Sequence, residues 1–295
     1  MGSAPEKLFF VAGTSMNTLK NKSVVITGAA SGIGRALALE CARRGARLLL
    51  ADINAPGLQQ AVDAAKAIGA LCDGLPTDTG DEAAIFALAA EAARLCGAAD
   101  VVVNNAGVTL VAPVATLPTA DAHWLMNINF WGVVHGCRAF LPQLRTRPEA
   151  VLVNISSIFA MVSVPTQSIY NAAKAAVRGF SDSLREELRG TPVRVLCVHP
   201  GGIRTNIARS ARLIDISLVA ASPQALHADF DAAARTSPEE AALAIVRAIE
   251  SGRTRLLIGA DARILDLLFR LFPTRASAWL TALARKRRGN IMATG

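Results

Sequence analysis

Hydrophobic residues follow two alternating patterns along the chain from residue 23 onward. Short runs rich in β-branched residues predict strands, and longer segments with apolar residues three and four positions apart predict helices. The predicted strands are Val24–Thr27, Arg47–Ala51, a weaker one at Ala70–Pro76, Val101–Asn104, Val151–Ser156, Val193–Val198 and Arg255–Ile258. The predicted helices are Arg35–Arg44, Leu58–Ile68, Glu82–Leu95, Asp121–Leu144, Ile169–Leu188 and Pro238–Glu250.

This regular alternation of strand and helix predicts the α/β class. Strand–helix–strand units form parallel sheets through right-handed crossovers. The predicted strands are continuous apolar runs, which is typical of a sheet covered on both faces. We therefore expect a single-domain, Rossmann-type doubly wound parallel sheet of about seven strands with helices on both faces, spanning residues 16–260.

Three segments depart from this alternation. Residues 1–15 lack clear periodicity and precede Met16, so we interpret them as an added leader or a disordered N-terminus. Residues 203–236 form a long connection of mixed arginine and apolar residues, which is typical of a substrate lid. Residues 261–295 are amphipathic and interrupted by Pro273, and they predict a helical extension that packs on the domain or on a second subunit. Peripheral membrane contact is the alternative for this extension.

Composition excludes several classes of protein. The chain has 295 residues, of which 52% are hydrophobic and 18% charged, too apolar for a disordered protein. No stretch reaches the roughly 18 consecutive apolar residues of a membrane-spanning helix, so no integral membrane span is expected. The five cysteines are scattered and lack any C-x-x-C spacing, which favours free thiols in a reducing compartment, the cytoplasm. The four histidines lack metal-binding spacing too, and no metal site is expected.

The net charge of +8 does not indicate a nucleic-acid partner. The basic residues are mostly arginines spread along the chain, and no binding motif accompanies them. The one dense basic run, Arg285–Arg288, suits the C-terminal end of a helix on dipole grounds.

A glycine-rich turn, T-G-A-A-S-G-I-G at residues 27–34, joins the first predicted strand to the first predicted helix. Glycines at this position let the backbone approach a pyrophosphate, and the helix N-terminus offers free N–H groups. Asp52 ends the second strand, where a carboxylate binds an adenosine ribose and repels a 2′-phosphate. NAD is therefore favoured over NADP. A helix-capping role for Asp52 and a phosphate contact by Arg35 are the alternatives.

The chain contains a single tyrosine, Tyr170, and Lys174 follows it by four residues, which places both on one helix face. Ser157 ends a predicted strand 13 residues before the tyrosine. A nearby positive charge favours the phenolate form of tyrosine, so Lys174 is expected to make Tyr170 a better base. His199 is interpreted as structural.

Together these motifs resemble the short-chain dehydrogenase/reductase family of NAD(P)-dependent oxidoreductases. The family motifs correspond to T-G-x-x-x-G-x-G at 27–34, N-N-A-G at 104–107, I-N-F-W-G at 128–132, the serine with Y-x-x-x-K at 157, 170 and 174, and H-P-G-G-I-R-T at 199–205. The resemblance implies a catalytic set of Asn129, Ser157, Tyr170 and Lys174. It also implies a homodimer or homotetramer, since the helices bearing Asn129 and Tyr170 commonly form the family's subunit interface.

The resemblance further assigns a set of residues to the dinucleotide. These are Gly28, Ser31, Gly32, Ile33, Gly34, Asp52, Ile53, Asp78, Thr79, Asn105, Ala106, Gly107, Tyr170, Lys174, Pro200, Gly201, Ile203 and Thr205. In the family, the lysine binds the nicotinamide ribose, and the Ile203–Thr205 motif binds the carboxamide. The resemblance also implies that Asp78 contacts the adenine.

We expect hydride transfer between NAD(H) and a hydrophobic secondary alcohol or ketone, with ring-bearing and steroid-like compounds among the candidates. Apolar residues of the 203–236 segment, together with Met161, Val162 and Val164, suggest this substrate class. One alternative is an NADP-dependent carbonyl or 3-oxoacyl reductase, against which Asp52 argues. A second alternative is a non-catalytic dinucleotide-binding protein, against which the complete catalytic set argues.

Overall fold

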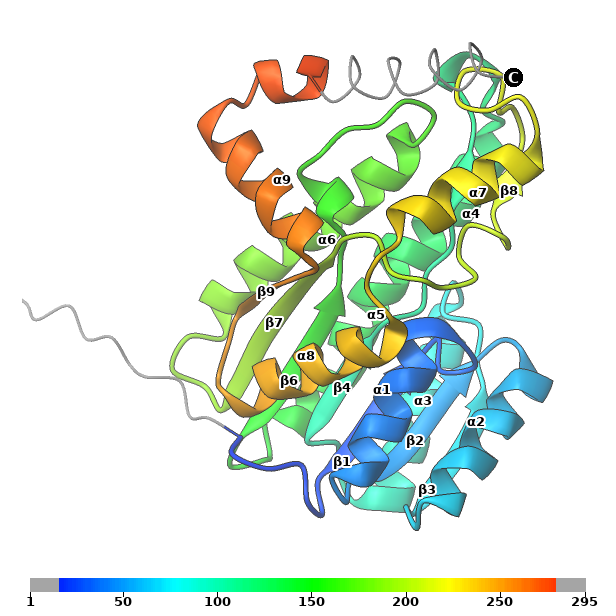
Figure 1. Cartoon of the computed structure of the whole chain (residues 1–295). Coiled ribbons are helices and arrows are strands. Elements are labelled where there is room, and N and C mark those ends of the chain that lie inside the picture. Colours follow the sequence, from blue (N-terminus) through cyan, green and yellow to red (C-terminus); the bar gives the residue numbers. More distant parts are fainter. Residues whose placement is uncertain (1–15, 280–295) are drawn as a thin grey trace, which may run out of the picture.

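Seven parallel strands form the central sheet in the computed structural model, which describes residues 16–279 (Figure 1). The strands are β1 (Ser23–Thr27), β2 (Arg47–Asp52), β3 (Cys72–Pro76), β4 (Val101–Asn104), β6 (Ala150–Ile155), β7 (Val193–Pro200) and β9 (Arg255–Ile258). Their order is β3-β2-β1-β4-β6-β7-β9, with all neighbours parallel. The chain reverses its direction of travel across the sheet after β3, so the doubly wound Rossmann-type prediction is confirmed.

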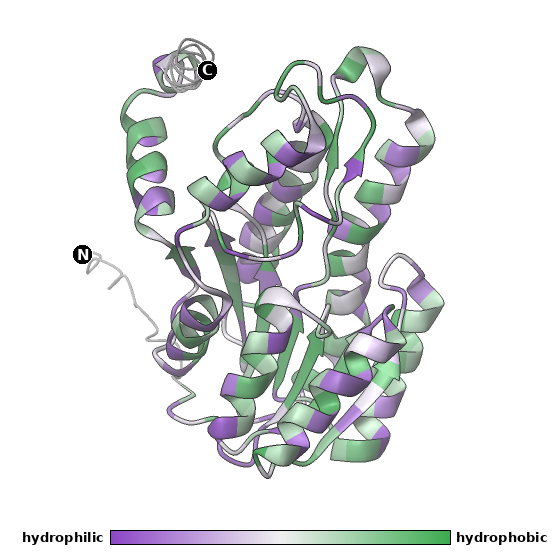
Figure 2. Ribbon diagram, turned by 45° about the vertical axis from the view of Figure 1, so that its right-hand side comes forward, coloured by the Kyte–Doolittle hydropathy of each residue, from purple (hydrophilic) through white to green (hydrophobic). Residues whose placement is uncertain are grey.

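Helices cover both faces of this sheet. One face is covered by α1 (Gly32–Arg43), α2 (Ala55–Ala67) and α8 (Pro238–Glu250), and the other by α3 (Glu82–Cys96), α5 (Gly132–Leu144) and α6 (Ser168–Glu187). The remaining helices are α4 (Thr119–Met126), α7 (Pro223–Ala233) and α9 (Ala260–Leu271). Successive strand side chains point to opposite faces, so Val24 and Ile26 pack with α1 and α8, whereas Val25 packs with α3 and α5. The central strands β1, β4 and β6 are accordingly mostly apolar (Figure 2), whereas the edge strand β3 carries the exposed residues Asp73 and Gly74.

Helix starts follow local capping chemistry. Asn54 accepts a hydrogen bond from Gly57 N, and Pro56 occupies the first turn, so α2 begins three residues before the predicted start at Leu58. Ser237 and Glu240 form a reciprocal capping box at α8, close to its predicted start. These side chains satisfy N–H groups that would otherwise lack partners.

The predicted helix over 121–144 is interrupted. It consists of α4, a π-helical turn at Asn127–Trp131 and α5. A π turn contains one extra residue, which changes the direction of its side chains relative to those of a regular α-helix. Such turns are frequent at functional sites. The turn carries Asn129, whose side chain is fully buried.

Residues 203–236 are more structured than a plain loop. They contain β8 (Arg212–Leu213), which pairs in parallel with β5 (Leu110–Val111), and they end with α7. Two 3-10 turns, Val114–Thr116 and Ile158–Ala160, complete the described elements. After α9, Pro273 interrupts the extension as predicted, and residues 275–279 are helical again.

Some predictions fall outside the described residues. They concern the leader at 1–15, the end of the C-terminal extension at 280–295 and the basic run Arg285–Arg288. Across residues 16–279, no helix combines the length and apolar character needed to cross a membrane.

Candidate active site

The glycine-rich turn between β1 and α1 depends on close backbone contacts. Gly28 and Gly32 have φ angles of +64° and +54°, where a Cβ is disfavoured. A Cβ on Gly34 would lie 2.1 Å from the carbonyl oxygen of Gly28, so a side chain does not fit there. Ser31 precedes α1 but its side chain does not cap the helix, so it does not occupy the first N–H groups. The turn thus fits an anionic group at a helix N-terminus.

Asp52 lies at the carboxyl end of β2, beside this turn. Its Oδ2 accepts a hydrogen bond from Ala30 N at 2.9 Å, and its Oδ1 accepts one from Asn54 N at 2.9 Å. The two backbone donors fix the carboxylate next to the turn, and each oxygen retains a lone pair for a ligand. The next residue, Ile53, is 70% exposed, which leaves an apolar side chain at the rim of this site.

Residues 105–107 lie against the glycine turn. Asn105 Nδ2 donates to the carbonyl oxygens of Thr27 and Gly28, at 2.9 and 3.1 Å. Thr27 Oγ1 accepts from the backbone N–H groups of Asn105 and Ala106. The contribution of Thr27 was not predicted, although a hydroxyl at the end of a buried strand is a usable signal. These bonds fasten the end of β4 to the end of β1.

Asp78 and Thr79 lie in the loop after β3. Asp78 is exposed, and its Oδ1 accepts from Gly80 N at 2.8 Å. Thr79 is buried, and a Cβ on Gly132 would lie 2.7 Å from its carbonyl oxygen, so this loop contacts the start of α5.

Tyr170 is buried on α6, close to Ser157 at the end of β6. Burial raises the pKa of Tyr170 to about 12, and a hydrogen bond with Ser157 acts in the opposite direction. Ser157 Oγ also accepts from Phe159 N at 3.1 Å, and the Phe159 ring meets the tyrosine ring edge-on, with centroids 6.2 Å apart. Burial thus moves the pKa of Tyr170 in the direction opposite to the lowering that was expected from Lys174.

Lys174 lies one helical turn beyond Tyr170 and is 3% exposed. Its Nζ donates to the carbonyl oxygen of Ile155 at 3.1 Å and lies 5.8 Å from the centroid of the Tyr170 ring. Burial lowers the pKa of Lys174 to about 8. The ammonium group is thus held beside the tyrosine in a poorly solvated position.

Asn129 is joined by paired hydrogen bonds to Val108, the residue that follows the 105–107 segment. Its Nδ2 donates to Val108 O and its Oδ1 accepts from Val108 N, both at 2.8 Å. A Cβ on Gly107 would lie 3.3 Å from Asn129 Oδ1 and 3.4 Å from Lys174 Nζ. The backbone of Gly107 therefore lies between the asparagine and the lysine. The same segment reaches the glycine turn through Asn105, so it connects the two halves of the site.

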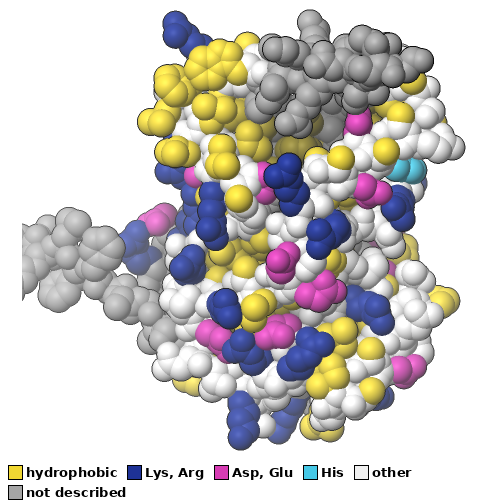
Figure 3. Space-filling model, viewed as in Figure 1, with side chains coloured by type: hydrophobic (Ala, Val, Ile, Leu, Met, Phe, Trp, Pro, Cys, Tyr) yellow, Lys and Arg dark blue, Asp and Glu magenta, His cyan; other side chains and the backbone are white. Residues whose placement is uncertain are grey.

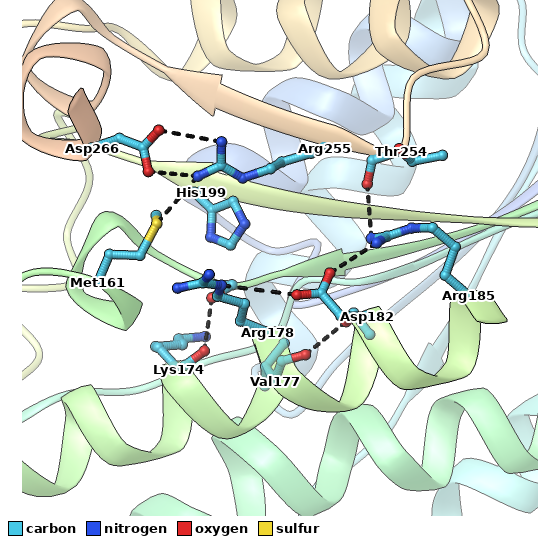
Figure 4. A network of polar contacts seen from close by, with 12 residues as sticks. Met161, Lys174, Val177, Arg178, Asp182, Arg185, His199, Thr254, Arg255 and Asp266 are labelled. Carbon is cyan, nitrogen blue, oxygen red and sulfur yellow. Dashed lines mark hydrogen bonds and ion pairs between the residues drawn. The ribbon is translucent and has the colours of Figure 1, made fainter. Parts of the chain in front are cut away.

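The last part of the candidate site consists of His199 and the loop after β7. His199 is buried, its Nδ1 lies 3.3 Å from Ser157 O, and Figure 4 places its ring between Arg255 and the α6 residues Lys174 and Arg178. Burial and then the positive charge of Arg255 lower the pKa of His199 to about 4, so the ring is neutral at physiological pH. This agrees with a structural role.

The 200–205 loop approaches the glycine turn and is held from α9. A Cβ on Gly32 would lie 3.2 Å from Thr205 Cγ2, so Thr205 is beside the turn. Asp261, at the start of α9, accepts a hydrogen bond from Gly202 N at 2.7 Å and crowds Gly201 so closely that a Cβ would not fit. Asp261 was not predicted, because it is 59 residues from its partner and belongs to no recognised motif.

Contacts in the 203–236 segment differ from those of a freely exposed lid. Arg212 lies over the Trp124 ring, 3.5 Å from its centroid, and pairs with Asp121 at 2.6 Å. Ile214 packs against the apolar cluster that contains Tyr170, as do Phe159, Met126, Trp124 and Ile169. In contrast, Val162 packs in a different apolar cluster, with Ala262 and Phe269 of α9.

Comparisons with known sequences find relatives of this chain. Residues 22–214 match the family model described as short chain dehydrogenase. A Mycobacterium tuberculosis protein named as an oxidoreductase, SadH, is 40% identical over 260 residues, covering 87% of this chain and 92% of its own. A Streptomyces avermitilis protein named 1-deoxy-11-beta-hydroxypentalenate dehydrogenase is 37% identical, covering 83% and 87%.

Solved structures give the same result. A Burkholderia phymatum short-chain dehydrogenase/reductase in complex with NAD superposes with a TM-score of 0.76 at 31% identity, covering 86% of this chain and 95% of that one. The chain therefore belongs to the short-chain dehydrogenase/reductase family. It is an NAD(P)-dependent oxidoreductase of the alcohol dehydrogenase or ketone reductase type.

Proposed function

We propose that the protein transfers a hydride between NAD(H) and a hydrophobic secondary alcohol or ketone, with ring-bearing and steroid-like compounds as the candidate substrates. The observation that carries the proposal is the 105–107 segment. It contacts the glycine turn through Asn105 and lies against Lys174 and Asn129 through Gly107. A dinucleotide bound at the turn would thus extend toward Tyr170.

In this proposal the catalytic residues are Asn129, Ser157, Tyr170 and Lys174. The nicotinamide accepts or donates the hydride when the cofactor is bound. Tyr170 donates its phenolic proton to a ketone oxygen, or removes the proton of an alcohol, and its high pKa makes the neutral form predominate before the substrate binds. Ser157 donates a hydrogen bond to the same substrate oxygen. Lys174 holds a ribose hydroxyl, and Asn129 holds the 107–108 backbone in place.

The proposed cofactor is NAD. Asp52 would accept hydrogen bonds from the adenosine ribose hydroxyls and repel a 2′-phosphate. The pyrophosphate would contact Gly28, Ser31, Gly32, Ile33 and Gly34, and the adenine would contact Ile53, Asp78 and Thr79. The remaining contacts are assigned to Asn105, Ala106, Gly107, Tyr170, Lys174, Pro200, Gly201, Ile203 and Thr205. The neighbour crystallised with NAD supports this choice.

The proposed substrate class rests on apolar contacts around Tyr170. Phe159 and Ile214 pack in the same cluster as the tyrosine, and the 203–236 segment, whose β8 pairs with β5, is the proposed substrate lid. The relative named as a hydroxypentalenate dehydrogenase supports a hydroxyl-bearing substrate.

We also propose a cytoplasmic homodimer or homotetramer. All five cysteines are free, and burial raises the pKa of Cys41 and Cys137 to about 12, which suits unreactive thiols in a reducing compartment. Trp131, just before α5, is 46% exposed on a helix that the family uses for subunit contact. Light scattering on the purified protein tests the assembly, and a monomeric mass would contradict it.

A substrate screen tests the catalytic proposal. Secondary alcohols and ketones of increasing ring content are assayed with NAD(H) and NADP(H) by nicotinamide absorbance. We expect the highest kcat/KM with NAD(H) and a cyclic apolar substrate. A preference for NADPH with acyl thioesters would instead identify a 3-oxoacyl reductase, and cofactor binding without any turnover would identify a non-catalytic protein.

A further inference from the structure

Helix α9 is apolar on two opposite faces. Its inner face carries Ala262, Leu265 and Phe269, which pack against the 3-10 turn after Ser157 and against β9. On the opposite face, Ile264, Leu267 and Leu271 are 66%, 58% and 63% exposed. At 3.6 residues per turn, these three residues form one continuous stripe along the helix. Burial of the inner face accounts for the packing of α9 on the domain, but it does not account for the apolar residues of the outer stripe.

The stripe lies on the outer surface of the molecule. Figure 3 has a hydrophobic patch at the upper left, where α9 lies in Figure 1, with Lys or Arg side chains along its border. Phe272 and Trp279, 43% and 47% exposed, extend the apolar character beyond the end of α9. Within residues 16–279, no element packs over the stripe.

An arginine-lined hollow borders the stripe. It has a volume of about 300 Å³ and is lined by Arg253, Arg255, Leu257 and Arg263. Arg255 and Leu257 alternate along β9, the edge strand of the sheet, and therefore share a face, whereas Arg253 lies two residues before the strand. Arg263 lies on α9, one turn before Leu267, so the hollow and the stripe are continuous.

The arginines of this hollow differ in their partners. Arg255 forms two hydrogen bonds with Asp266, at 3.2 and 2.6 Å, so its charge is neutralised. Among the described residues, the side chains of Arg253 and Arg263 have no carboxylate partner. Two cationic groups thus face solvent at the edge of an exposed apolar helix face. A guanidinium group binds a phosphate strongly through paired N–H donors.

We propose that the α9 stripe and the arginine hollow form a docking surface for an anionic phospholipid membrane. In this arrangement the axis of α9 lies along the membrane plane, with Ile264, Leu267 and Leu271 in the acyl boundary. Arg253 and Arg263 bind lipid phosphates at the headgroup level. The combination of an apolar helix face rich in leucine with flanking arginines matches the chemistry of interfacial helices. A protein partner would not require unpaired cations at this border.

Vesicle flotation with the full-length protein tests this proposal. Wild type is expected to float with vesicles made of equal parts of phosphatidylcholine and phosphatidylglycerol, and to float less with phosphatidylcholine alone. Replacing Leu267 and Leu271 together (Leu267→Gln, Leu271→Gln) is expected to lower the partition coefficient about tenfold. The pair Arg253→Gln, Arg263→Gln is expected to lower it about tenfold on the anionic vesicles only.

Matched controls use the opposite end of the sheet. Leu71→Gln and Arg47→Gln replace exposed residues near the amino ends of β3 and β2, and they should float like wild type. All variants should keep the wild-type thermal unfolding temperature and turnover, because none of the replaced side chains is buried. If wild type does not float, or if all variants float equally, the proposal is wrong. It is also wrong if light scattering shows that the leucine pair dissociates an oligomer, because a second copy then covers the stripe.

Discussion

Lys174 Nζ lies 5.8 Å from the centroid of the Tyr170 ring, and burial moves the pKa values of these two groups in opposite directions. The tyrosine becomes harder to deprotonate, whereas the lysine becomes easier to deprotonate. Desolvation disfavours the charged form of each group. At neutral pH the desolvation cost falls on Lys174 alone, because Tyr170 is uncharged in both the folded and the unfolded state, and this cost has measurable consequences.

The first prediction concerns stability. The folded pKa of Lys174, about 8, lies below the ordinary value of 10.5 for a lysine, so the unfolded state binds more protons between these two values. Stability should therefore rise with pH across that window. Lys174→Met should abolish turnover, yet raise the free energy of unfolding at pH 7 by roughly 1–3 kcal/mol, because a buried ammonium group is removed.

Urea unfolding at several pH values measures this effect. The stabilisation by Lys174→Met should shrink as the pH approaches 10, where wild-type Lys174 is already neutral in the folded state. A variant that is less stable than wild type at pH 7 would show that the hydrogen bond to Ile155 O outweighs desolvation.

The second prediction concerns cofactor preference. Asp52→Ser removes the carboxylate that two backbone N–H groups hold beside the glycine turn. The ratio of kcat/KM for NADH to that for NADPH should fall at least about tenfold, because the repulsion of a 2′-phosphate is lost. Asp63→Asn, an exposed change on α2, serves as the control and should leave the ratio unchanged. An unaltered ratio in Asp52→Ser would assign Asp52 to structure alone.

Much of the fold could be predicted from the sequence because its signals are local. Strands such as Val101–Asn104 are buried on both faces and consist of unbroken apolar runs, and all seven were located. Helix starts were less accurate, since the start of α2 depends on Asn54 and Pro56, which lie outside its apolar pattern. The π turn at Asn127–Trp131 carries Asn129, whose hydrogen bonds join it to Val108, 21 residues earlier in the chain, and no local pattern encodes such a contact.

The residues of the candidate site likewise divide into those that the sequence predicts and those that only the folded chain brings together. Tyr170 and Lys174 follow one another at helical spacing, so their shared face could be predicted. The hydrogen bond from Gly202 N to Asp261 joins the loop after β7 to the start of α9, and only the folded sheet brings them together. The pairing of β8 with β5 likewise joins two-residue strands that are too short to give a sequence signal.

A third prediction follows from Asp261 as a positioning residue. Asp261→Ala should free the 200–205 loop and raise KM for NAD about tenfold, with a smaller change in kcat. Asp261→Asn keeps an acceptor oxygen for Gly202 N and should restore most of the affinity. Steady-state kinetics with thermal unfolding as the fold control measures this. A variant with unchanged KM and lowered kcat would contradict a role in holding the loop.

The most direct measurement is turnover of Tyr170→Phe, with the best substrate from the screen and with NADH binding followed by fluorescence. If Tyr170 moves the proton, kcat/KM should fall by about 10²–10⁴-fold, while the dissociation constant of NADH stays within about threefold of wild type. The ring is retained, so its contact with Phe159 and the packing of α6 are preserved. A variant that binds NADH and keeps wild-type turnover would contradict the account.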